Sequence, residues 1–346
     1  MRWPLRTSRT PIGVDLGMRR LKAAQFSRSQ TGWRLEAAVS VPRPDTQRQI
    51  GPEDVRQLHH LLEKGAFRGT SVVLAVPADM LLTGIMELPP EDSGAPLDVL
   101  ARAEFARMHK CSQESLEMAC WHLPAPARAA NTTFVMGVAC RHDDANPLLD
   151  LFEAEHFDVK RLETQARALA AACRPLLADV GGIAGILDIG WASARLVLLF
   201  QHTLVYERGL SRSGLNSLAT SLAEELSSDL RQVEEMLTGA RKLDGRTRKA
   251  KALAAAMAGH FGALVEEMRI PLSYLANQYP DAEMERLLLV GGGAALPGLP
   301  EHLASALECD VRVALPSDFA ECPESFDTAY GPTLATAVGL GQLEGK

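Results

Sequence analysis

Two segments in different halves of the chain share one pattern, and this repetition limits the folds that the chain can adopt. The segments are IGVDLGMRRLKAAQF at residues 12–26 and GILDIGWASARLVLL at residues 185–199. Each reads as an apolar strand, an Asp-x-Gly turn and, a few residues later, an Arg-Leu pair that leads into a second strand. Such a repeat, with one copy in each half, predicts a protein built from two related α/β units.

The Asp-x-Gly turns have chemistry suited to phosphate. A hairpin tip exposes backbone N–H groups, and glycine lets a ligand approach the backbone closely. The carboxylate beside the turn can hold a hydrated Mg²⁺ ion. Asp and Gly are also common in hairpins for conformational reasons alone, so one such turn is weak evidence. Two matching turns, at residues 15–17 and 188–190, and a third glycine-rich turn at 291–293 favour a phosphate site.

Composition excludes several classes of function. The 346 residues suffice for two compact lobes, and the formal net charge of −7 argues against nucleic acid as a partner. The six cysteines lack the spacing of a metal site and indicate reduced thiols. No apolar run is long enough to span a membrane, and the basic N-terminus lacks the apolar core of a secretory signal. These features predict a cytoplasmic protein.

The order of the expected elements suggests how the chain is divided. Residues 1–11 are expected to form a flexible basic arm, and residues 70–160 read as a small α+β unit set between two parts of a larger fold. Helical spacing of apolar residues predicts a helix at 161–177. One long helix is expected at 215–237, because its leucines and Val233 share one face.

Several stretches resemble the actin-like ATPase superfamily and, within it, the PilM family of type IV pilus assembly proteins. The resemblance is carried by VVLAVPADMLLTGIMELP at 72–89, SLAEELSSDLRQVEEML at 221–237 and LLLVGGGAALPGLPEHLASAL at 287–307. It implies an α/β fold of the actin-like type, with two lobes formed by duplicated ribonuclease-H-like domains. An inserted small α+β subdomain would belong to the first lobe.

The resemblance also implies domain boundaries. The first actin-like lobe would comprise residues 12–69 and 161–180, and the inserted subdomain residues 70–160. The second actin-like lobe would comprise residues 181–346. The nucleotide would then lie between the two lobes.

The family resemblance assigns residues to an ATP and Mg²⁺ site. The cofactor-binding positions would be Asp15, Gly17 and Lys22 in the first hairpin, Asp188, Gly190 and Ser193 in the second, Glu266 and Arg269 at the base and ribose, and the Gly291, Gly292 and Gly293 turn. Asp15 and Asp188 would hold Mg²⁺ through water. Glu163, expected at the connecting helix, would be the catalytic carboxylate that positions metal or attacking water.

The chain departs from the family pattern at both hairpins. Met18, Arg19 and Arg20 stand where small hydroxyl residues are usual, and the arginines either bind inward with charge or decorate the surface. Trp191 stands where relatives favour a small residue, and Arg195 where a small polar residue is common. Either the tryptophan points into the lobe interface, or protein rather than ATP fills the pocket. We expect weak or absent ATP hydrolysis, with nucleotide binding still open.

The resemblance implies a cytoplasmic adaptor at the inner face of the cytoplasmic membrane. Its partner would be the cytoplasmic N-terminal tail of an inner-membrane PilN-type protein, received in a groove between the inserted subdomain and the first lobe. Two alternatives remain: an active small-molecule kinase or ATPase of the superfamily, and a filament-forming protein similar to FtsA. The final GLGQLEGK does not read as the amphipathic membrane helix usual in FtsA, and the membrane segment of GspL is not expected either.

Overall fold

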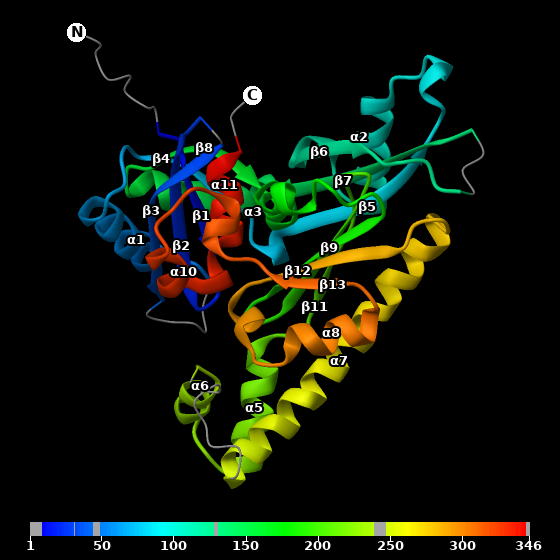
Figure 1. Ribbon diagram of the computed structural model, residues 1–346. Coiled ribbons are helices and arrows are strands. Elements are labelled where there is room, and N and C mark those ends of the chain that lie inside the picture. Colours follow the sequence, from blue (N-terminus) through cyan, green and yellow to red (C-terminus); the bar gives the residue numbers. More distant parts are fainter. Residues whose placement is uncertain (1–8, 31, 44–48, 128–130, 239–246, 344–346) are drawn as a thin grey trace.

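Two five-stranded sheets with the same strand order form the centre of the protein (Figure 1). The computed structural model describes residues 9–30, 32–43, 49–127, 131–238 and 247–343. The first sheet has the order β3 (Trp33–Pro42), β2 (Arg20–Arg28), β1 (Ile12–Leu16), β4 (Ser71–Ala75), β8 (Asp158–Glu163). The second has the order β11 (Thr203–Leu210), β10 (Ala194–Phe200), β9 (Ile183–Ile189), β12 (Met284–Val290), β13 (Asp310–Val313).

The strand directions in the two sheets also match. In each sheet the first three strands along the chain form an antiparallel meander. A fourth strand pairs in parallel with the first strand of the meander, and a fifth pairs in parallel with the fourth. All five residues of β1 are buried, as a strand covered on both faces requires. The predicted two-lobe fold of duplicated α/β units is therefore confirmed.

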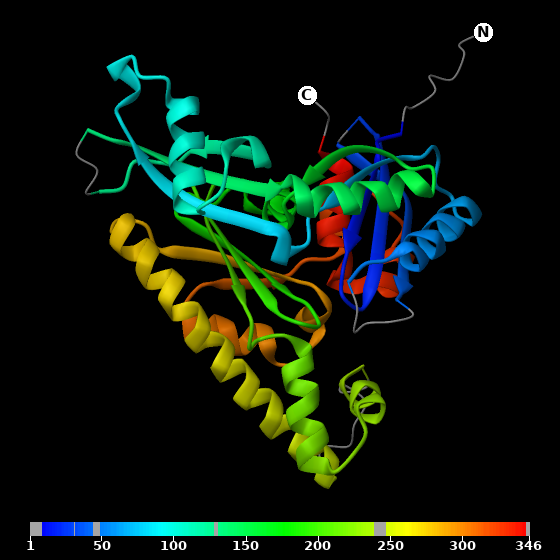
Figure 2. The ribbon, with the colours of Figure 1, turned by 180° about the vertical axis from the view of Figure 1, so that it is seen from behind.

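A third sheet forms a separate small unit, beyond the two large sheets in Figures 1 and 2. Its order is β5 (Leu81–Leu88), β7 (Thr133–Arg141), β6 (Leu116–His122), and α2 (Leu97–Met108) covers one face. A Cβ on Gly137 would lie 2.6 Å from the Phe105 ring, so glycine is needed where the helix meets β7. The small unit also contacts the second lobe, because Trp121 Nε1 donates to the Leu204 carbonyl at 2.8 Å.

The sheet memberships differ from the predicted division at several elements. Strand β4 and the first residues of β8 fall within the 70–160 range predicted for the inserted subdomain, but both strands pair in the first large sheet. Strand β4 belongs to the large sheet because it pairs in parallel with β1. Helix α3 (His142–Ala154) packs in the first-lobe core through Leu148 and Phe152. The strands of the small sheet itself run from 81 to 141.

The last helix, α11 (Ala335–Gln342), packs on the first sheet although it follows the second lobe in sequence (Figure 1). Glycines permit this close packing. A Cβ on Gly339 would lie 1.8 Å from the carbonyl oxygen of Ala168 in α4 (Gln165–Cys173). A Cβ on Gly13 of β1 would lie 2.2 Å from the carbonyl oxygen of Ala337. The first lobe is therefore completed by the C-terminal segment.

The prediction of one long helix at 215–237 is wrong, because this segment forms two helices, α5 (Leu215–Leu226) and α6 (Leu230–Thr238). Ser227 ends α5 with a positive φ of 49°. The side chain of Asp229 then accepts a hydrogen bond from the N–H of Gln232 at 2.9 Å and starts the next helix. Helix α6 therefore turns away from the line of α5, as Figure 2 shows below the sheets.

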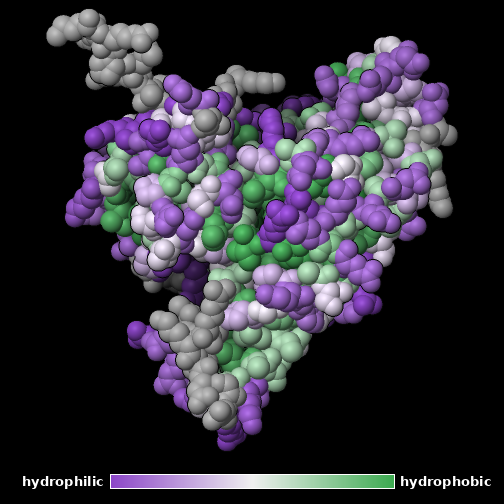
Figure 3. Space-filling view, viewed as in Figure 1, coloured by the Kyte–Doolittle hydropathy of each residue, from purple (hydrophilic) through white to green (hydrophobic). Residues whose placement is uncertain are grey.

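The remaining helices cover the sheets. They are α1 (Pro52–Lys64), α7 (Arg248–Gln278), α8 (Leu299–Leu307), α9 (Pro316–Phe319) and α10 (Ser325–Tyr330). In the space-filling view, apolar residues gather in the middle of the face shown, and polar residues surround them (Figure 3). Within the described part of the chain, no helix combines the length and apolarity needed to cross a membrane.

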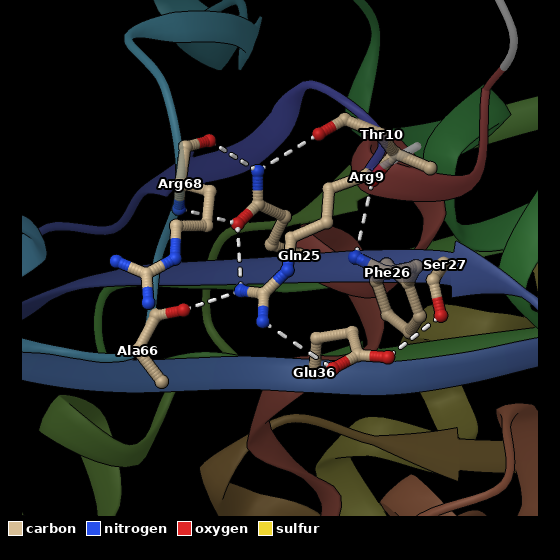
Figure 4. A network of polar contacts seen from close by, with 8 residues as sticks. All are labelled: Arg9, Thr10, Gln25, Phe26, Ser27, Glu36, Ala66 and Arg68. Atoms are coloured by element: carbon tan, nitrogen blue, oxygen red, sulfur yellow. Dashed lines mark hydrogen bonds and ion pairs between the residues drawn. The ribbon is translucent and has the colours of Figure 1, made fainter. Parts of the chain in front are cut away.

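The predicted flexible arm at 1–11 lies partly outside the described residues, since the structure describes the chain only from Arg9 onward. From there the chain is held against the first sheet (Figure 4). Thr10 N–H donates to the Phe26 carbonyl at 2.9 Å. The Arg9 guanidinium contacts Gln25, Glu36 and the Ala66 carbonyl. Residues 9–11 thus extend the fold of the first lobe.

We predict that Gly339→Ala lowers the free energy of unfolding by roughly 3 kcal/mol, because the added methyl group has no room beside Ala168. The control is Gly259→Ala in α7, where no atom lies within 4 Å of the added Cβ. This change should be neutral or stabilising by up to about 1 kcal/mol, since alanine favours helix. Urea unfolding followed by circular dichroism measures both, and equal effects would contradict the role of close packing.

Candidate functional site

The tips of the two Asp-x-Gly hairpins meet across the two lobes. In the first, Leu16 of β1 pairs with Leu21 of β2, which leaves residues 17–20 at the tip. In the second, the Gly190 N–H donates to the Ser193 carbonyl at 3.0 Å and closes the turn. The Arg19 guanidinium carbon lies 3.7 Å from the centre of the Trp191 ring. The structure therefore brings the two predicted turns together.

Lys22 connects the bases of the two hairpins electrostatically. Its Nζ lies 2.6 Å from Asp15 Oδ2, and the two side chains are 18% and 6% exposed. Burial disfavours the charged lysine, but attraction to Asp15 and Asp188 outweighs burial and raises the pKa of Lys22. Burial also raises the pKa of Asp188, an effect that the Lys22 charge partly offsets. One ammonium group thus balances a carboxylate from each lobe.

The third glycine turn packs against the base of the second hairpin. Gly291 has a φ of +82°, and a Cβ there would lie 2.2 Å from Asp188 Oδ1. A Cβ on Gly293 would lie 2.2 Å from the Ile189 side chain, whereas the nearest atom to one on Gly292 is 3.6 Å away. Close packing therefore requires Gly291 beside the Asp188 carboxylate and Gly293 beside the Ile189 side chain.

Arg19 and Trp191 both contact α6. The Arg19 guanidinium donates two hydrogen bonds to the Glu234 carboxylate, at 2.8 and 2.5 Å. Trp191 is half-buried against an apolar cluster in which Leu222 comes from α5, Val233 from α6 and Leu253 from α7. Arg19 therefore points inward, although its partner is the Glu234 carboxylate and not a phosphate, and Trp191 lies in the interface between the lobes.

A family model described as type IV pilus assembly protein PilM matches residues 13–342. The chain belongs to the PilM family. No protein in a search of curated sequences matches the chain.

Two solved structures share the fold. A PilM–PilN type IV pilus biogenesis complex aligns with a TM-score of 0.77 and 23% identity, over 97% of this chain and 99% of that chain. Ethanolamine utilization protein EutJ from Carboxydothermus hydrogenoformans aligns with a TM-score of 0.54 and 13% identity, over 99% of this chain and 92% of that chain. At these identities the likeness establishes the actin-like fold of this PilM family member.

The sequence predicted Glu163 at the connecting helix, but the residue is the last one of β8. The chain is still extended there because β8 pairs with β4, and the helix begins only after Thr164. The carboxylate is buried and accepts a hydrogen bond from the Thr164 N–H at 2.9 Å. It also forms ion pairs with Arg161 and Arg167, at 3.0 and 3.2 Å. Two guanidinium groups therefore neutralise the carboxylate, although its buried Oε2 accepts no hydrogen bond among the described residues.

Glu266 and Arg269 are not brought to the hairpins by any described contact. They pair with each other at 3.5 Å on α7, and their side chains are 63% and 67% exposed. The adjacent Glu267 instead turns inward, where it accepts from the Ser213 hydroxyl and contacts Arg212. Helical periodicity explains the difference, because adjacent residues project about 100° apart.

Arg195, which also departs from the PilM pattern, forms an ion pair with Glu207 that stabilises the second sheet. It lies 3.4 Å from Glu207 of the neighbouring strand β11, with side chains 14% and 6% exposed. Burial raises the pKa of Glu207, and the nearby Arg195 charge opposes this shift. Arg195 also donates to Gln165 Oε1 in α4 at 3.2 Å. The residue therefore joins β10 to its neighbours, and the exposed Ser193 remains near the hairpin tip.

The described arrangement does not fit an ATP–Mg²⁺ complex. Asp15 is bound to Lys22, and Arg19 with Trp191 spans the hairpin tips where phosphates would be cradled. The PilM family member retains the actin-like shape, while its own side chains connect the two hairpins.

We predict that Lys22→Met destabilises the protein by about 3 kcal/mol at pH 7, because two buried carboxylates lose their cation. The loss should shrink as the pH falls from about 7 towards 4. Asp188 already has a raised pKa, and without Lys22 it rises further, so protonation at lower pH relieves the repulsion.

Lys160→Met provides the control, because Lys160 also lies 2.6 Å from a carboxylate, that of Asp158, but both side chains are about half exposed. It should cost less than about 1 kcal/mol. Urea unfolding at several pH values measures both variants. A Lys22→Met effect that is independent of pH would refute the paired-carboxylate explanation.

Proposed function

We propose that this PilM family protein is a cytoplasmic adaptor of a type IV pilus or related secretion machine. It docks the cytoplasmic N-terminal tail of an inner-membrane PilN-type protein and so lies at the inner face of the membrane. The observation that carries the proposal is the family match over residues 13–342, together with the fold shared with a protein solved in a PilM–PilN complex. The interlobe contacts favour an adaptor over a kinase, because they occupy the groups that phosphoryl transfer would need.

The small sheet supplies a strand edge for such a tail. In the described part of the chain, β5 pairs with β7 on one side and is the end strand of its sheet. An end strand offers backbone N–H and C=O groups to which an extended peptide can add. A peptide bound there would extend the small sheet from three strands to four.

The side chains of β5 alternate between two environments. Leu82, Met86 and Leu88 pack in the core beneath α2. Leu81, Thr83, Ile85 and Glu87 therefore project from the other face of the sheet. An incoming strand would place apolar side chains against Ile85, which is half-buried in this structure.

The junction between the small sheet and the first lobe provides an apolar anchor beside this edge. Met80, Leu81 and Leu162 pack there, partly buried, against the buried Val76 and Cys140. Leu162 belongs to β8 of the first lobe, and Leu81 begins β5. A tail along β5 would therefore end against both units, which supports the groove expected between them.

We predict that Ile85→Asp weakens binding of a synthetic PilN-type tail peptide by roughly ten-fold, because a charge replaces an apolar contact in the groove. Ile270→Asp is the control, since Ile270 is 63% exposed on α7 and belongs to no strand of the small sheet. Fluorescence anisotropy with a labelled peptide gives both affinities. Absence of binding by the unmodified chain would refute the proposed function, and equal affinities for the two variants would refute the β5 site.

A further inference from the structure

We propose that three side chains of this protein take over the role of a bridging nucleotide and hold the two lobes together. These residues, Arg19, Trp191 and Glu234, are called the interlobe clamp below. Arg19 comes from the first lobe, Trp191 from the second hairpin and Glu234 from α6. This inference goes beyond partner docking and does not depend on it.

The chemistry of the interlobe clamp resembles that of a bound phosphate group. The Arg19 guanidinium makes a two-point contact with the Glu234 carboxylate, and its planar fork suits a carboxylate as well as a phosphate. Its face lies over the Trp191 ring, where cation–π attraction adds to the ion pair. The side chains of Arg19 and Glu234 are 34% and 27% exposed, so water screens the pair only partly.

The direction of Arg19 is set by the hairpin geometry. Its neighbour Arg20 turns to its own lobe and donates to the hydroxyl and carbonyl oxygens of Ser40, both at 2.7 Å. Arg19, one residue earlier, instead reaches Glu234, which lies 215 residues later in the sequence. Adjacent arginines at one tip therefore have different roles, and only Arg19 links the lobes through these contacts.

Helix α6 is the movable part of the interlobe clamp. It spans only Leu230–Thr238 and follows a break in the helical run at Ser227. Val233 and the partly buried Leu237 pack it against α5 and α7, whereas Leu230 is 42% exposed. A short helix held by so small an apolar face can shift without disturbing either sheet. Such a shift would withdraw Glu234 and release Arg19.

In the usual case a bound ligand closes the two lobes, whereas here the interlobe clamp holds them closed without a ligand. A ligand favours the closed state only by its higher affinity for that state. Here the closed contact already exists between side chains, so ATP must first displace Arg19 and Trp191 from the hairpin tips. Opening of the clamp is therefore a step that precedes any nucleotide entry.

Hydrogen exchange on the full chain tests the proposal. Arg19→Ala and Glu234→Gln should each speed amide exchange in peptides covering 16–21 and 189–195 by roughly ten-fold, because both remove the ion pair and Arg19→Ala also removes the cation–π contact. The matched controls are Arg20→Ala, on the same tip, and Glu235→Gln, exposed on the same helix. The controls should leave both peptides unchanged. Equal acceleration by controls and clamp variants, or none by either clamp variant, would overturn the proposal.

A second measurement uses ATP with Mg²⁺ as the probe, in calorimetric titrations of the same four variants. The clamp predicts tighter binding by Arg19→Ala and Glu234→Gln than by the unmodified chain and the controls. Tighter ATP binding by the unmodified chain than by both clamp variants would refute it. Binding of the tail peptide should be equal in all of them, so loss of peptide binding by the unmodified chain would count against the proposed function alone.

Discussion

The attraction of the Lys22 ammonium group to Asp15, its ion-pair partner, and to Asp188 links the two lobes electrostatically and is central to their arrangement. Each carboxylate belongs to one of the two equivalent first strands, β1 and β9, so the repeated sequence places two negative charges at the centre of the molecule. Two buried carboxylates that sense each other's charge repel unless a cation offsets it. Lys22, two residues along β2 from the hairpin tip, supplies that cation from the protein itself.

Close packing around this charged centre explains the positions of several glycines. Gly291 leaves room for the Asp188 carboxylate, and Gly293 for the Ile189 side chain. Gly13 and Gly339 let α11 lie directly on β1 and against α4. The same glycines would also suit a nucleotide-binding fold, so their presence alone does not distinguish a phosphate site from a tightly packed scaffold.

Membership of the PilM family establishes the fold and the assembly role, whereas the chemistry between the hairpin tips depends on individual side chains. In this chain the hairpin tips carry an arginine and a tryptophan, and these meet each other. Their contact continues to α6 through Glu234. The hairpin tips, the end strand β5 proposed for docking and the first-lobe core involve different residues, and each can therefore be tested separately.

The sequence by itself determined the features that depend on residues close together in the chain. The two Asp-x-Gly hairpins, the glycine turn at 291–293 and the duplication follow from local conformational preference and from repetition, and the structure has all of them. The sequence also drew attention to Trp191 as the residue least compatible with a phosphate. These predictions needed no knowledge of distant contacts.

Only the tertiary structure decided which distant side chains meet. The break at Ser227 was hidden because leucines continue at helical spacing across it, while the cap at Asp229 allows α6 to turn. The direction of Arg19 depends on Glu234, and Glu163 remained in a strand because β4 lies beside it. Side chains of one type can point to solvent, a ligand or another lobe at similar local cost, so the choice is made by the partner that folding brings near.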